Sequence, residues 1–178
     1  MPEILFDPVD SVTAGAIGEP GKRVFLLQAT SGNARVTVLL EKEQVVLLAT
    51  RLDVLLDRVA AELPEEPGTL AAAKASEEPL REDEPLFRAL ALGLGFEAQR
   101  QAVLVELRER PEVEDESSSG LDEPESHVVR LFMTRAQARA MVVSAAEAIK
   151  GGRPLCTLCH LPMDPSGHAC PATNGHRR

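Results

Sequence analysis

The residues best suited to metal chemistry gather at one end of this 178-residue chain, where the last 23 positions hold all three cysteines and three of the four histidines. Two residues separate Cys156 from Cys159, so a tight turn can point both thiolates at one ion. His168 and Cys170 form a second pair, after prolines and a glycine that bend the chain back. Thiolate and imidazole donors favour zinc over magnesium or calcium. We therefore predict a Zn²⁺ site formed by Cys156, Cys159, His168 and Cys170.

Two other histidines are alternative fourth ligands. His160 directly follows Cys159, where strain would hinder binding of both to one ion. His176 lies almost at the chain end and is the stronger competitor. Three thiolates and one imidazole would fill all four positions of a tetrahedral ion and leave none for water. We therefore expect a structural rather than a catalytic zinc, which fastens the tail (residues 151–178) to the helix before it.

Upstream of the tail, the hydrophobic pattern predicts three strands and a helix in each of two successive units. The first unit (residues 1–63) has strands at 11–17, 23–29 and 35–40, and a helix from Glu41 to Leu63. The second unit (residues 86–150) has strands at 87–94, 100–110 and 127–133, with a turn at 95–98 between the first two. Its helix begins at the capping box of Thr134 and Gln137 and ends at Lys150.

The predicted fold is therefore α+β, with two βββα units that form antiparallel sheets backed by helices, followed by a C-terminal zinc knuckle. The repeated element order indicates an internal repeat, in which the units share one sheet or pack face to face. A single α+β domain whose halves resemble each other by chance is the alternative that the pattern leaves open.

Two acidic spacers interrupt this pattern, at residues 64–85 and 111–125. Each holds seven acidic residues, so they account for half of the 28 acids in a chain of net charge −9. Without them the remaining residues carry +3. Segments rich in Glu, Pro, Ser and Ala bury too little apolar surface to offset their ordering entropy, so we expect the spacers to be loosely held.

The composition excludes several classes of protein. With five Phe, no Trp and no Tyr, the core must be aliphatic and base stacking is disfavoured, so a nucleic-acid partner is not expected. No apolar run approaches the roughly 20 residues of a membrane span, and the N-terminus does not resemble a signal peptide. Three clustered cysteines do not form a disulfide framework. We expect a cytoplasmic protein without membrane contact.

Several stretches resemble an actinobacterial family of uncharacterised proteins that is defined as a domain of unknown function. Its members end in a pattern close to Cys-Pro-x-Cys-Gly-x-Pro-x-Asp-Pro-x-Gly-His-x-Cys-Pro-x-x-Asn-Gly-Tyr-Arg-Arg, and this chain ends in CTLCHLPMDPSGHACPATNGHRR. FDPVDSVTAGAIGEPGKRVFLLQA and LEKEQVVLLATRLDVLLDRV are also similar to the family. The resemblance implies zinc ligands at the four predicted positions. It places His160 and His176 where the family has Gly and Tyr, which counts against both as ligands.

The sequence supports three functional hypotheses. The first is a non-enzymatic binding or adaptor protein with an unidentified protein partner. The second is an enzyme, or an enzyme accessory, that acts on a small phosphorylated or thiol metabolite. The third is a nucleic-acid-binding protein, because repeated sheet-and-helix units occur in single-strand binders, although the net acidity and the lack of aromatics oppose it.

Overall fold

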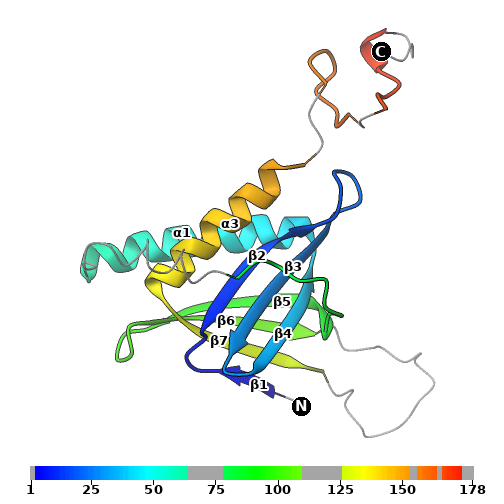
Figure 1. The fold of residues 1–178 in the computed structure, drawn as a ribbon. Coiled ribbons are helices and arrows are strands. Elements are labelled where there is room, and N and C mark those ends of the chain that lie inside the picture. The colour runs from blue at the N-terminus through cyan, green and yellow to red at the C-terminus, as the bar shows by residue number, and fades with distance from the viewer. Residues whose placement is uncertain (1–2, 64–77, 110–125, 153–155, 164–165, 174–178) are drawn as a thin grey trace, which may run out of the picture.

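Seven strands form one sheet in the order β1-β7-β6-β5-β4-β3-β2, and helices α1 (Lys42–Glu62) and α3 (Arg135–Lys150) pack on it in the computed structural model (Figure 1). The structure describes residues 3–63, 78–109, 126–152, 156–163 and 166–173. The α+β class is confirmed. The first half has four strands before its helix, one more than predicted, and the second half has the order βββα. The strands are β1 (Glu3–Phe6), β2 (Ser11–Ile17), β3 (Val24–Ser31), β4 (Ala34–Leu40), β5 (Phe87–Glu97), β6 (Ala102–Glu109) and β7 (Val128–Thr134).

The sheet must curve, because its two edge strands follow each other in the chain. Five Cα steps separate the end of β1 from the start of β2 and span at most about 18 Å. In a flat sheet the two edges would lie about 29 Å apart. The residues that connect β1 to β2 hydrogen bond to strands near both edges of the sheet. The Val9 amide donates to the carbonyl of Phe132 in β7 at 2.9 Å, and the Asp10 amide donates to the carbonyl of Thr30 in β3 at 2.8 Å. Figure 1 accordingly shows β2, β3 and β4 crossing β5, β6 and β7 at a steep angle.

The core between the curved sheet and the helices is aliphatic, as the composition predicts. The inward face of α1 repeats at three- and four-residue steps, which buries Val45, Leu48, Leu52, Leu56 and Val59. In α3 small residues at buried positions let the helix approach both β2 and α1 closely. The Thr134 and Gln137 capping box is present as predicted. Neither described helix is long and apolar enough to cross a bilayer.

Three features of the sheet differ from the prediction. The sheet is mixed, because β4 pairs with β5 and β1 pairs with β7 in parallel, so the expectation of purely antiparallel sheets is wrong. β5 begins beside Val38, near the end of β4, and runs in the same direction, so the two strands pair in parallel at Val38–Phe87 and Leu39–Arg88. β1 was not predicted. β5 continues to Glu97, and the turn predicted at 95–98 lies at 98–101.

Residues 78–86, which we call the strap, lie across the outer face of β2, β3 and β4. The Gln28 side chain makes two hydrogen bonds with the strap backbone, to Arg81 O at 2.7 Å and from Arg81 N at 2.8 Å. Thr13 donates to the Glu78 carbonyl at 2.9 Å. A loosely held spacer was therefore the wrong expectation for residues 78–85. The rest of the two spacers (64–77 and 111–125) lies outside the described residues.

Candidate metal centre

The chain leaves the body of the molecule at the end of α3. Arg23, the residue directly before β3, binds that end of the helix. Arg23 donates from Nη1 to the Ala148 carbonyl at 2.9 Å, where the helix dipole favours a cation. A Cβ at Gly151 would lie 2.7 Å from the same Nη1, so a larger residue there would displace the guanidinium. In Figure 1 the tail continues beyond the end of α3, away from the strands. The sequence analysis did not identify Arg23.

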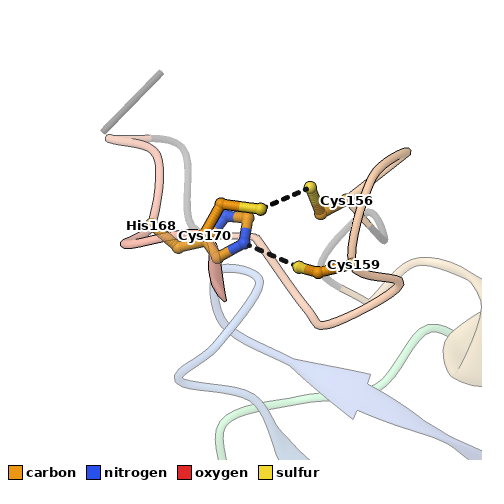
Figure 2. Close-up of side chains that lie close together, drawn as sticks. All are labelled: Cys156, Cys159, His168 and Cys170. Atoms are coloured by element: carbon orange, nitrogen blue, oxygen red, sulfur yellow. Dashed lines mark hydrogen bonds between the residues drawn. The ribbon is translucent and has the colours of Figure 1, made fainter. Parts of the chain in front are cut away.

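The four predicted side chains converge in the tail (Figure 2). Cys156 Sγ lies 3.9 Å from Cys170 Sγ, and Cys159 Sγ lies 3.1 Å from His168 Nε2. All four donor atoms lie within 4.8 Å of one another. A tetrahedral site with metal–sulfur bonds of about 2.3 Å would place two sulfurs about 3.8 Å apart. The arrangement therefore fits a single metal ion that contacts all four atoms.

A tight turn brings the first two thiols together. The His160 amide donates to the Cys156 carbonyl at 2.9 Å, and the Leu158 amide points at Cys156 Sγ from 3.5 Å. The turn requires a left-handed residue at its end, because His160 has φ of 57°. Glycine adopts this conformation most easily. His160 is exposed, and its contribution to the turn is made by its backbone.

The sulfurs influence each other's protonation. Hydrogen bonds from the Cys159 and Leu158 amides lower the pKa of Cys156 to about 7. The Leu161 amide also favours the thiolate of Cys159, but burial and the neighbouring sulfurs of Cys170 and Cys156 outweigh it and raise the pKa of Cys159. One thiolate therefore forms readily while the next is opposed by like charge. A bound cation would remove that opposition, as expected for a thiolate metal site.

Residues 4–170 match the model of a family described as a protein of unknown function (DUF3090). The chain belongs to the DUF3090 family. The matched range contains all four converging residues and ends at the last of them. No curated protein and no solved structure matches this DUF3090 chain.

Within this DUF3090 chain, burial separates the predicted ligands from His160, which is exposed. Cys156 and Cys170 are 7% and 3% exposed, whereas Cys159 and His168 are half-buried. The described cluster does not include His160, which we had considered as an alternative ligand. His176, the other alternative, lies outside the described residues. The geometry therefore favours Cys156, Cys159, His168 and Cys170 over a set that contains His160.

Proposed function

We propose that this protein is a zinc-binding, non-enzymatic interaction module in which a structural Zn²⁺ holds the tail in shape. The observation that supports this proposal is the convergence of three thiols and one imidazole within 4.8 Å. Three thiolates and an imidazole complete a tetrahedron, so the ion keeps no open position for substrate or activated water. Soft sulfur donors favour zinc among the common divalent ions.

The tail also carries the surface through which such a module would bind. Leu158 and Leu161 flank Cys159 and are 49% and 48% exposed. Metal ligation would fix the turn that carries them and so present two leucines to solvent at low entropic cost. A preordered pair of leucines suits an apolar patch on a partner protein.

Two further observations support a protein partner in a reducing compartment. Glu78 and Asp83 of the strap form ion pairs with Arg35 on β4, so this base of the outer face is already neutralised and is not available to a nucleic-acid backbone. Three thiols that ligate a metal require reducing conditions, which the cytoplasm provides.

The metal part of the proposal is tested by elemental analysis of the purified full chain. We expect about one zinc per chain, as for a closed four-ligand site. Cys156→Ser and Cys170→Ser should each lose most of the zinc, whereas the matched histidine variant His160→Gly should retain it. A chain that contains no zinc when purified from zinc-supplemented medium would refute the proposal.

The binding part is tested by comparing proteins captured by three forms of the full chain. Leu158→Asp with Leu161→Asp should keep the zinc and lose the captured partner. Leu5→Asp is the matched control, because Leu5 is a leucine of similar exposure, 53%, on β1. If all three forms capture the same proteins, the two leucines are not a binding surface. Zinc content measured in parallel separates loss of the surface from loss of the metal.

A further inference from the structure

The solvent face of α1 carries aliphatic side chains that the core does not use. Leu47 is 46% exposed and Val54 is 57% exposed, and they are seven positions, about two helical turns, apart. Thr50 lies between them on the same face. Its hydroxyl donates to the Val46 carbonyl at 2.8 Å, which satisfies the polar group within the helix. The middle of this face is therefore an apolar stripe.

Opposite charges stand at the two ends of the stripe. Glu43 precedes Leu47 by one helical turn, and Arg58 follows Val54 by one helical turn, so all four side chains point to the same side. Both charged residues are exposed. The ion pairs of the described residues do not include either of them. The α1 face thus has an acid near its N-terminal end and a base near its C-terminal end.

Two copies of this face, placed against each other in antiparallel orientation, are complementary in shape and charge. Leu47 and Val54 are equally far from the point between Thr50 and Arg51, and so are Glu43 and Arg58. A two-fold axis at that point would place Leu47 against the partner's Val54 and Glu43 against the partner's Arg58, each contact occurring twice. Such self-complementarity is what a two-fold symmetric interface requires.

We propose that α1 pairs in antiparallel fashion with α1 of a second copy of this chain, in a two-fold symmetric dimer. Arg51 does not oppose this arrangement, because its side chain lines a cavity of about 120 Å³ on the flank of the stripe that faces β5. The same cavity is lined by Leu47 and Leu48 of α1 and by Leu92 and Leu94 of β5. Thr50 would therefore lie at the midpoint of the contact, next to the two-fold axis. The metal plays no part in this contact, so the proposal is independent of the proposed function.

The interface is expected to be small. From Glu43 to Arg58 the helix is about 22 Å long, and a single helix pair of that length is shorter than a standard protein interface. The dimer should therefore dissociate on dilution, with a dissociation constant on the order of micromolar. Burial of the aliphatic stripe supplies the attraction, and the charged ends select the antiparallel direction.

Sedimentation equilibrium of the full chain, with zinc and a reductant, tests the proposal between about 1 and 100 µM. The wild type should pass from monomer to dimer over this range. Leu47→Asp should raise the dissociation constant at least about tenfold, because it places two carboxylates in the stripe. Leu90→Asp is the matched control, because Leu90 is 55% exposed on β5 and lies outside the stripe.

A charge exchange tests the direction of the pair. Glu43→Arg and Arg58→Glu should each weaken the dimer, since each places like charges opposite one another. The double variant should recover wild-type affinity, because it restores opposite charges at both ends. A chain that remains monomeric at every concentration would exclude the dimer. A dimer that responds to Leu90→Asp instead of Leu47→Asp, or a double variant weaker than both single variants, would exclude this interface. Far-UV circular dichroism confirms that each variant is folded.

Discussion

The body of the molecule and the tail are held together by different interactions. In the body, a continuous cluster of buried aliphatic side chains joins the sheet to both helices, and Leu27, Leu52 and Leu107 are completely buried. In the described part of the tail, residues 156–163 and 166–173, the buried side chains are Cys156 and Cys170. The tail therefore replaces an apolar core with donor atoms that converge on one point.

This difference follows from segment length. A chain segment of fewer than 30 residues cannot bury enough apolar surface to fold by itself, so it needs a cross-link such as a metal ion. The body is long enough to form a core, and its strands and helices need no such ligand. The two regions should consequently respond to different perturbations, and the following experiments test how far they are independent.

Removal of the metal should have the largest effect, and only on the tail. Zinc binding contributes roughly 10–16 kcal/mol to the folding of isolated zinc-finger peptides, so chelation should unfold the tail. Amide hydrogen exchange, read segment by segment, should show lost protection around Cys156 and Cys170 and unchanged protection in β3 and β6. Simultaneous loss of protection in the strands would contradict the independence of the two regions.

A cavity in the core should have the reverse effect. Leu52→Ala removes a completely buried side chain and should lower the free energy of unfolding by about 2–5 kcal/mol. Urea unfolding followed by circular dichroism measures this loss. The zinc content of the native variant should stay the same. Leu90→Ala, at an exposed position, should change stability by less than about 0.5 kcal/mol.

The junction between the two regions should show a smaller effect. Gly151→Ala places a methyl group against the Arg23 guanidinium, which is the end of a flexible side chain and can shift, so the substitution should lower the free energy of unfolding by at most about 1 kcal/mol. Gly151 has φ of −68°, so the cost comes from the contact and not from the backbone conformation. In a chain that already carries Arg23→Ala, the same substitution should cost almost nothing. Equal costs in both backgrounds would show that the clash with Arg23 is not the cause.

The smallest effect concerns pH and the outer face of the sheet. The Arg130 side chain, which donates to Glu106 at 2.7 Å, and Arg108 hold the pKa of Glu106 below its ordinary value. A lowered pKa stabilises the fold above the unfolded-state value and loses this contribution as pH falls through the folded-state value. At pH 7 the free energy of unfolding of the wild type should exceed that of Glu106→Gln by under about 1 kcal/mol. The two free energies should become equal at acidic pH, where Glu106 is protonated. A difference that persists at acidic pH would refute the ionic origin.

Local patterns predicted most of the body. The strands and helices that the sequence analysis found have turns of Gly and Pro between them, a two-residue alternation, or a stripe such as that of α1, and each of these signals lies within a few residues. The four converging tail residues were also named from spacing alone, because two short ligand pairs joined by a proline-rich turn have few other uses. Their ligation of zinc stays a prediction.

The features that were missed depend on distant partners. β1 is four residues long, and its register with β7 joins Glu3 to Val128, so no local signal marks it as a strand. The strap was judged from its acidic composition, but its backbone is held by Gln28, a residue 53 positions away from Arg81.

The short first strand has a practical consequence for handling the protein. A chain shortened to begin at Ser11, where the first predicted strand starts, would lack the residues that pair with Val128 to Leu131. The main-chain donors and acceptors along that side of β7 would then face water, next to the buried side chains of the curved sheet. Open strand edges of this kind recruit other chains into intermolecular sheets. Such a truncated protein should precipitate on concentration even though every residue of its helices is intact.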